Sequence, residues 1–418
     1  MFLPFSIDPS QNTKNTFSKL NVEKFQWCPN DDDHEMPECD ILFNGTDRIK
    51  MKRGKAWKPP CRYTDEDIAQ IAENCTDLKL RFHFPSTSFN AEDVKFPLAY
   101  TLLTEKEAEQ TVRLLSAIFQ PQNAYCLTYD LDAGPVFAKA MESVVKCFPE
   151  NLWTPATKRH VLWADFSVLE STMECVRILS SAQHSWKYIQ ILSWNDMPLK
   201  TNHQMVEIFQ LFNGASDSEL ALGQPERFRY FHSKQVPGGD ESQKIPVPPN
   251  GLVVYKSSFA VSLSREFVHF VVNHPIAKEF FEYSRTSWAA EEQFWSTLIH
   301  NVFLNQTGNF PGTCLHYYRL EATNKDWISR YQVWGPCKGS IVSGSCVFGV
   351  GDLMWMKNRP ELVAHKIYRD FEPAVWYCMH RWHFERSRSG NEKINLTFYR
   401  NLPAVRYNEL KNKNEFMC

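Results

Sequence analysis

From residue 96 onward, short apolar segments alternate with longer segments of helical periodicity, and this alternation restricts the chain to few folds. The expected strands span residues 96–104, 123–130, 152–153 and 188–194. The expected helices between them span residues 105–119, 134–148 and 164–181. Such spacing is typical of an α/β fold with a mostly parallel, Rossmann-like sheet and right-handed crossovers. No GxGxxG turn follows the first strand, which disfavours a dinucleotide-dependent dehydrogenase.

The end of the strand at 188–194 is the best-marked candidate for a functional position. It runs into Asn195 and Asp196, and Pro198 is expected to stop any strand ladder there. Helical periodicity resumes after Thr201. Open α/β sheets bind ligands beyond the carboxyl ends of their strands, so Asp196 lies where chemistry is expected. The simpler alternative, that Asp196 only caps a turn, is about as well supported.

The remaining segments have weaker patterns. We expect a strand at 253–263, a helix at 267–282 that Pro275 kinks or splits, and a helix at 289–301. The segment 214–250 is expected to be a long loop, and 302–418 to be irregular. Residues 1–92 are polar and mostly irregular apart from a short helix at 64–72. We therefore divide the chain into a stem and N-terminal cover, 1–92, and an α/β domain, 93–418.

Net charge and aromatic content limit the kinds of partner that we expect. The formal net charge is −2, and no basic stripe recurs along a helix, so nucleic acid is not an expected partner. Aromatic residues make up 14% of the chain, which suits a sugar-binding cleft but equally suits a large core. The composition is that of a globular protein.

The cysteines indicate an oxidising compartment. The chain has 12 of them, with no CxxC pair and no zinc-like spacing, so disulfides are the better account. Asn-x-Thr sequons at Asn44, Asn74, Asn305 and Asn395 agree with a secretory route. No signal peptide or transmembrane segment is visible, so we expect a membrane anchor upstream of this sequence.

Six segments, in order along the chain, together resemble one family. They are Phe96-Pro-Leu-Ala-Tyr100, Pro121-Gln-Asn-Ala-Tyr-Cys126, Trp186-Lys-Tyr188, Asp196-Met-Pro-Leu-Lys-Thr-Asn202, Glu291-Glu-Gln-Phe-Trp-Ser-Thr-Leu298 and Cys346-Val-Phe-Gly-Val-Gly-Asp-Leu-Met-Trp355. The set resembles the core 2/I-branching β-1,6-N-acetylglucosaminyltransferase family. The resemblance implies a GT-A-type glycosyltransferase fold in the Golgi lumen behind a type II anchor. It also implies inverting transfer from a UDP-sugar without a metal ion, hence no cofactor.

Glu292 is the expected catalytic base. Inverting transfer needs a base that takes the proton of the acceptor hydroxyl as its oxygen attacks the anomeric carbon. The resemblance gives this role to the second acid of an Asp/Glu-Glu-x-x-Trp segment, which Glu292 and Trp295 match. The alternative is that Glu291 and Glu292 only complement a helix dipole, in the first turn of the helix at 289–301.

The departing UDP needs positive charge, which metal-free members of the family are expected to supply with one Arg and one Lys. Lys366 matches the Lys, but Ser343 stands at the Arg position. Lys338 or Arg381 are candidates to replace the missing cation. The alternative is a Mn²⁺ ion at the Asp130-Leu-Asp132 sequence, although the resemblance assigns Asp130 to the uridine or ribose.

The resemblance also assigns binding residues. The donor or nucleotide site is expected to contain Leu103, Asp130, Trp163, Asp196 and Lys366, with Glu105 replacing a common His and Met197 a Phe. Arg227 and Tyr331 are expected to border the acceptor site, although Arg227 is as well explained as a solvated charge.

The resemblance further implies four disulfides: Cys39–Cys378, Cys75–Cys147, Cys126–Cys175 and Cys337–Cys346. Of the remaining cysteines, Cys28 and Cys61 can pair, Cys314 is left over and Cys418 is either free or intermolecular. His380 and His383 beside Cys378 are interpreted as surface histidines, not metal ligands.

The sequence thus predicts an inverting transferase that moves GlcNAc, or glucose or xylose, from a UDP-sugar to an O-glycan or glycoprotein acceptor and forms a β-1,6 branch. One alternative is a catalytically impaired member that only binds glycan or nucleotide. Another is a cysteine-rich interaction protein that has only the fold.

Overall fold

The computed structural model describes residues 24–29, 34–223, 227, 247–312, 326–390, 393–410 and 413. Its centre is a five-stranded sheet of order β3-β2-β1-β4-β8. The strands are β1 Leu98–Thr104, β2 Ala124–Tyr129, β3 Leu152–Trp153, β4 Tyr188–Ser193 and β8 Ser262–Ser264. The first four are parallel, and β8 pairs antiparallel with β4. The predicted α/β fold of GT-A type, with a mostly parallel sheet, is confirmed.

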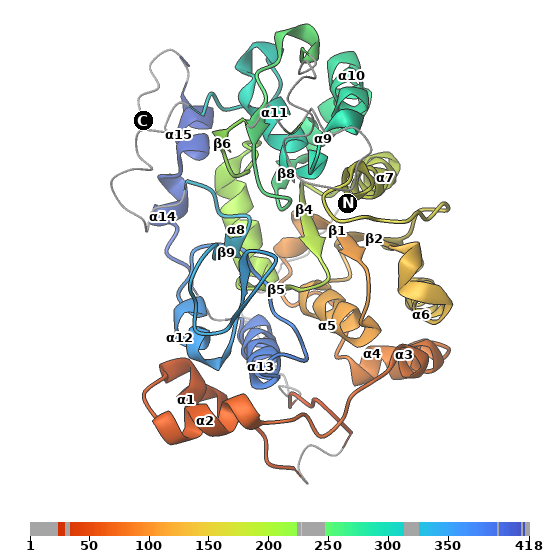
Figure 1. The fold of residues 1–418 in the computed structure, drawn as a ribbon, viewed down its shortest axis with the longest axis vertical. Helices are drawn as coiled ribbons and strands as arrows, with labels where there is room; N and C mark the ends of the chain where they lie inside the picture. The colour runs from red at the N-terminus through yellow and green to blue at the C-terminus, as the bar shows by residue number, and fades with distance from the viewer. Residues whose placement is uncertain are drawn as a thin grey trace, which may run out of the picture.

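Helices cover both faces of this sheet (Figure 1). One layer contains α5 Ala108–Ile118, α6 Gly134–Lys146 and α8 Asn202–Phe212; the other contains α7 Phe166–Ser181, α9 Arg265–Asn273, α10 Pro275–Tyr283 and α11 Phe294–His300. Strand residues alternate between the layers, because successive side chains of a strand point to opposite faces. Tyr100 and Leu102 are buried with the first layer, whereas Ala99 is buried with the second.

A second, three-stranded sheet of order β5-β12-β9 brings distant segments together. Its strands are β5 Asp196–Pro198, β9 Tyr331–Gln332 and β12 Val363–His365. Pro198 is the last residue of β5, so the strand ends there as expected, although Pro198 itself still pairs with Val363 in antiparallel register. A proline is tolerated there because β5 is an edge strand, where one N–H needs no partner. This sheet places Asp196 beside His365.

Two other predicted elements, a strand and a helix, are each interrupted in the structure. The segment 253–263 forms the short strand β7 Tyr255–Lys256 and leads into β8, not one continuous strand. The helix expected at 289–301 is divided into the 3₁₀ turn η7 Ala290–Glu292 and α11, because Gln293 has non-helical dihedrals of φ −133° and ψ −34°. Pro275 splits α9 from α10, as predicted.

The C-terminal segment is far more ordered than the sequence predicts. It contains β10 Ser340–Val342, β11 Ser345–Val347, α12 Leu353–Met356, α13 Ala374–Ser389, α14 Thr397–Arg400 and α15 Pro403–Glu409. His380 and His383 lie on α13 and are buried, so their interpretation as surface histidines is wrong. Burial lowers the pKa of His383 to about 3, and its ring contacts the backbone oxygen of Lys200.

The N-terminal cover also contains helices: α1 Cys39–Asn44, α2 Arg48–Ala56, α3 Asp65–Ile71 and α4 Cys75–Arg81. Helices α1 and α2 lie at one end of the molecule beside α12 and α13 (Figure 1). Trp27 and Phe43 share a core with Trp376 of α13, so the cover packs directly on the C-terminal segment. The domain boundary near residue 93 stays a prediction.

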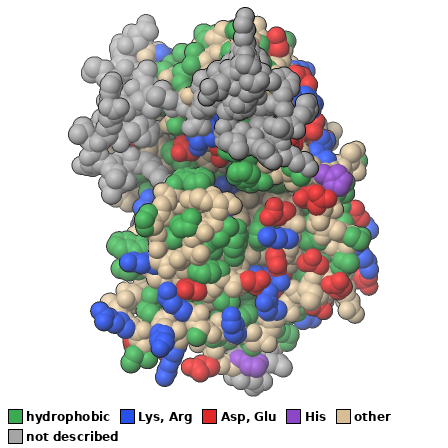
Figure 2. All heavy atoms as spheres, viewed as in Figure 1, with side chains coloured by type: hydrophobic (Ala, Val, Ile, Leu, Met, Phe, Trp, Pro, Cys, Tyr) green, Lys and Arg blue, Asp and Glu red, His purple; other side chains and the backbone are tan. Residues whose placement is uncertain are grey.

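All four disulfides implied by the resemblance are present, together with Cys28–Cys61. The Cys39–Cys378 bridge spans 339 residues and fixes the cover to α13. Cys314 and Cys418, like most of the loop at 214–250, lie outside the described residues. Among the described helices, none has the length and apolar character needed to cross a membrane. On the face drawn in Figure 2, acidic and basic side chains are interspersed, in keeping with the small net charge.

Candidate active site

A cleft of about 290 Å³ opens at the carboxyl ends of β1, β2 and β4. Its lining includes Leu103, Thr104, Glu105, Asp130, Trp163, Asn195, Glu291, Glu292, Arg330, Trp334, Ser343, His365, Lys366 and Tyr368. The position follows from topology, because the carboxyl ends of parallel strands meet at one edge of the sheet. Five of the predicted site residues therefore line one cavity, among them Glu292 and Lys366.

Asp196, by contrast, lies buried beneath the cleft in a closed network of polar contacts. Its Oδ2 accepts hydrogen bonds from the Ser193 N–H at 2.8 Å and from the Arg330 guanidinium at 2.6 Å, and its Oδ1 lies 2.9 Å from His365 Nδ1. Burial raises the pKa of Asp196, but Arg330 and His365 outweigh it, and the net pKa is below its usual value. Burial and Arg330 lower the pKa of His365 to about 4, so its ring is neutral near pH 7. Asp196 is thus an ionised anchor for Arg330 and His365.

Lys366 follows β12 directly and supplies positive charge to the cleft wall. Its Nζ donates a hydrogen bond to the backbone oxygen of Val342 at 2.7 Å and lies 5.8 Å from the centre of the Tyr368 ring. Burial lowers the pKa of Lys366, whereas the carboxylate of Glu105 opposes that shift. Ser343 lies in the turn between β10 and β11, also on the lining. An arginine at 343 would therefore stand beside Lys366, in the same wall.

Neither residue expected to replace that arginine lines the cleft. Arg381 is ion-paired with Glu385 on α13, and Lys338 donates its backbone N–H to Asp352. Arg330 does line the cleft, and it is the arginine that sequence reasoning missed. No sequence signal marked it, because its place depends on the contact between β9 and β5 through β12.

Glu292 lines the same cleft from a different element, at the end of the turn η7. We refer to the lining from η7 and the lining from β12 as the two walls of the cleft. Its Oε2 accepts a hydrogen bond from Arg227 at 2.9 Å and lies 3.9 Å from Lys256 Nζ. Lys256 Nζ also lies 3.7 Å from Oε2 of Glu219. The alternative interpretation of Arg227 as a solvated charge is wrong, since it is 6% exposed. Two cations therefore contact the Glu292 carboxylate and orient it.

Aromatic side chains stand at the mouth of the cleft. Trp163 and Trp334 both line it, and they are 77% and 59% exposed. Trp163 makes an edge contact with Trp288, whose ring lies 4.7 Å from the guanidinium carbon of Arg227. Exposed tryptophan faces suit sugar rings and nucleobases, which present flat apolar surfaces. Tyr331 points elsewhere and stacks on Phe348, so it is not brought to the cleft.

Two groups of side chains have spacing compatible with a cation. In the first, Asp130, Asp132 and His160 place ligand atoms within 4.8 Å of one another. Asp130 Oδ1 already accepts two backbone N–H groups, from Asp132 and Val161, each at 3.0 Å. Asp132 Oδ1 lies 2.7 Å from His160 Nδ1. These contacts use one oxygen, Oδ1, of each carboxylate.

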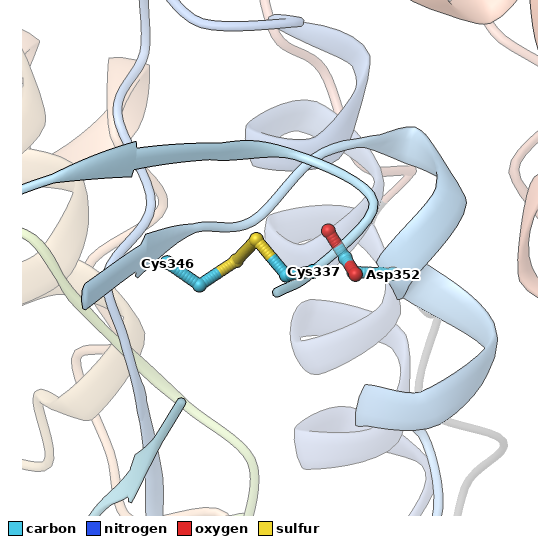
Figure 3. A group of neighbouring side chains, drawn as sticks. All are labelled: Cys337, Cys346 and Asp352. Atoms are coloured by element: carbon cyan, nitrogen blue, oxygen red, sulfur yellow. A yellow bond between two sulfur atoms is a disulfide. The ribbon is translucent and has the colours of Figure 1, made fainter. Parts of the chain in front are cut away.

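The second group consists of Cys337, Cys346 and Asp352, shown in Figure 3. The two sulfur atoms are joined in a disulfide, so neither is the thiolate that binds a metal. Asp352 instead accepts backbone hydrogen bonds from Lys338 and Gly349, each at 2.9 Å. This group fixes the β10–β11 hairpin that carries Ser343.

Comparison with known proteins agrees with this geometry. The sequence model of the core-2/I-branching enzyme family matches residues 98–357. The chain is 32% identical to an N-acetyllactosaminide β-1,6-N-acetylglucosaminyl-transferase of Mus musculus, over 76% of this chain and 80% of that protein. It is 29% identical to a probable β-1,3-galactosyl-O-glycosyl-glycoprotein β-1,6-N-acetylglucosaminyltransferase 7 of Sus scrofa, over 82% and 81% respectively. The chain therefore belongs to the core-2/I-branching enzyme family and is a glycosyltransferase.

Proposed function

We propose that this protein is an inverting β-1,6-N-acetylglucosaminyltransferase that uses UDP-GlcNAc and branches a galactose-containing O-glycan or lactosamine chain. The observation that carries the proposal is that Glu292 and Lys366 line one cleft, at the edge of the sheet where ligands of α/β folds bind. The names of the mouse and pig relatives support this choice of sugar and acceptor.

The chemistry assigned to Glu292 is general base catalysis. The acceptor hydroxyl oxygen attacks the anomeric carbon, its proton passes to the Glu292 carboxylate, and the bond from that carbon to the UDP oxygen breaks. The contacts from Arg227 and Lys256 are made to Oε2, so proton transfer is expected at Oε1. Both cations keep the carboxylate in place before the acceptor arrives, which reduces the entropy lost in the transition state.

The wall that contains Lys366 is assigned to stabilisation of the leaving group. As the bond to UDP breaks, negative charge grows on the diphosphate, and Lys366 supplies a cation there. Arg330 also lines the cleft and is a second source of positive charge. Because Arg330 is already paired with Asp196, its contribution is expected to be smaller than that of an arginine at 343.

The other binding residues are assigned from their positions around the cleft. Leu103 and Asp130 lie at the ends of β1 and β2, and Trp163 lies in the segment before α7; all three line the cleft and are assigned to the nucleoside. Arg227 pairs with Glu292 and is assigned to the acceptor side. The reaction is proposed to need no metal. The five described disulfides favour the lumen of the secretory pathway, for which the Golgi is the proposed site.

The test is transfer itself. Purified protein is incubated with UDP-GlcNAc, UDP-glucose or UDP-xylose and with β-1,3-galactosyl-O-glycan or lactosamine acceptors, and the product linkage is determined by NMR. We expect a β-1,6-linked GlcNAc product. Binding of UDP, seen as a rise in melting temperature, without transfer from any donor would show a nucleotide-binding protein that lacks this activity.

A further inference from the structure

Glu291 lies next to the proposed base but in a very different environment. It precedes Glu292 in the turn η7, lines the cleft and is only 8% exposed. Its Oε2 is buried and has no hydrogen-bond partner within the described part of the chain. A buried carboxyl oxygen without a partner destabilises the folded protein, so such a group in a cleft is a candidate for a ligand contact.

The charges around Glu291 determine its protonation state. It interacts electrostatically with Glu292 on its own turn, with Asp165 at the start of α7 and, with the opposite sign, with Arg227. Arg227 makes its 2.9 Å ion pair with Glu292, so among the described residues the influence of Arg227 on Glu291 is opposed by two acidic neighbours, Glu292 and Asp165. Burial, and next to it the charge of Glu292, raise the pKa of Glu291 to about 8.

A neutral carboxyl group differs from a carboxylate in what it binds. It donates through its O–H and accepts through its other oxygen, which matches the paired donors and acceptors of a sugar ring. We propose that Glu291 is a substrate-binding residue of this site, a buried carboxyl held in its protonated form that exchanges hydrogen bonds with the sugar bound beside Glu292. This role rests on the proposed glycosyl transfer, and it gives the two adjacent glutamates opposite chemistry.

The alternative is that Glu291 is only a buried structural residue, and Glu291→Leu separates the two. Leucine fills a similar volume without an unpaired polar oxygen, so the melting temperature should be equal or higher. If Glu291 binds the sugar, kcat/KM for transfer should nevertheless fall about tenfold or more. A purely structural role predicts no such loss in a variant that is at least as stable.

The second variant, Glu291→Gln, tests the protonated form. Its amide is neutral and both donates and accepts hydrogen bonds, so it should recover much of the turnover that Glu291→Leu loses. In the wild type, kcat/KM should fall as the pH rises through about 8, because the proton is lost; the Gln variant should lack this fall. Any decline caused by Lys366 would remain in both proteins, which distinguishes the two groups.

Infrared difference spectra between the wild type and Glu291→Gln at pH 7 give a readout independent of activity. We expect the carbonyl band of a protonated carboxyl group in the wild type. Wild-type turnover in Glu291→Leu, or a Gln variant as inactive as the Leu variant, would overturn the inference while leaving the proposed function intact. Absence of transfer by the wild type itself would overturn the proposed function and, with it, this role of Glu291.

Discussion

The two walls of the cleft carry opposite charges but differ in how those charges are held. On the wall of η7, the Glu292 carboxylate is fixed by Arg227 and Lys256. On the wall of β12, the ammonium of Lys366 contacts a backbone oxygen, not a carboxylate. One wall thus has its electrostatic partners in place, and the other keeps a cation available for a ligand anion.

This difference corresponds to the two halves of the proposed reaction. A base has to be oriented before the acceptor hydroxyl arrives, so partners within the protein favour it. A cation that stabilises departing UDP acts on charge that the substrate brings, so a carboxylate partner would weaken it. The missing arginine at 343 affects only the second half. The proposed base therefore has its contacts within the protein, whereas the proposed anion-binding wall lacks one of the two cations that the family resemblance implies.

The strongest test of the base wall is Glu292→Gln. The amide keeps the shape of the side chain but does not accept the acceptor proton, so transfer should fall by about 10²–10⁴-fold. UDP should still raise the melting temperature, because nucleotide contacts lie on the other wall. The exposed Glu150→Gln is the matched control. Transfer at wild-type rates in the variant would remove Glu292 from the role of base.

A smaller effect is expected from Lys366→Met, on the β12 wall. Loss of the ammonium should raise the donor KM and lower kcat, together about 10²-fold, with UDP affinity reduced in parallel. Glu292→Gln, in contrast, should leave UDP affinity unchanged. Lys146→Met, at the exposed end of α6, is the control for loss of charge. Equal UDP affinity in wild type and Lys366→Met would show that the two walls do not divide the work in this way.

Ser343→Arg should have a moderate effect in the opposite direction. It adds a guanidinium to the wall that holds Lys366, and we expect the donor KM to fall about three- to thirtyfold. Ser343 has φ +48°, and one non-glycine residue replaces another, so the change adds no new backbone restriction. The control is Ser181→Arg, at the exposed end of α7. A KM that does not fall would mean that the wall already has sufficient positive charge, with Arg330 as its source.

The sequence predicted the central sheet and its helices well because these elements carry strong periodicity. The apolar run of β4 and the buried stripe of α8 are readable from residue spacing alone. The sheet β5-β12-β9 was missed because each strand has only two or three residues and its partners are distant in sequence. Helix α13 was missed because its buried surface combines aromatic and histidine side chains with small apolar residues and does not form a simple apolar stripe.

In the candidate site, too, some residues were predictable from the sequence and others were not. Glu292 and Lys366 were predicted through family resemblance, and the structure places both on one cleft. The raised pKa of Glu291 was not predictable from spacing, since it depends first on burial and then on the charge of Glu292. Arg330 was missed for a related reason, because its partner Asp196 lies on another element.

The smallest effect is expected from metal removal. This experiment tests whether Lys366 stabilises the departing diphosphate without a metal ion. If Mn²⁺ bound at Asp130 and Asp132, it would stabilise the diphosphate and the cleft would not depend on Lys366. Because Asp130 Oδ1 already accepts two backbone N–H groups and Asp132 pairs with His160, we expect EDTA to leave the transfer rate unchanged. The assay compares rates in EDTA and in added Mn²⁺ for the wild type and for Lys366→Met. Rescue of Lys366→Met by Mn²⁺ would assign the anion-stabilising role to the acidic pair after β2, and the division between the two walls would no longer hold.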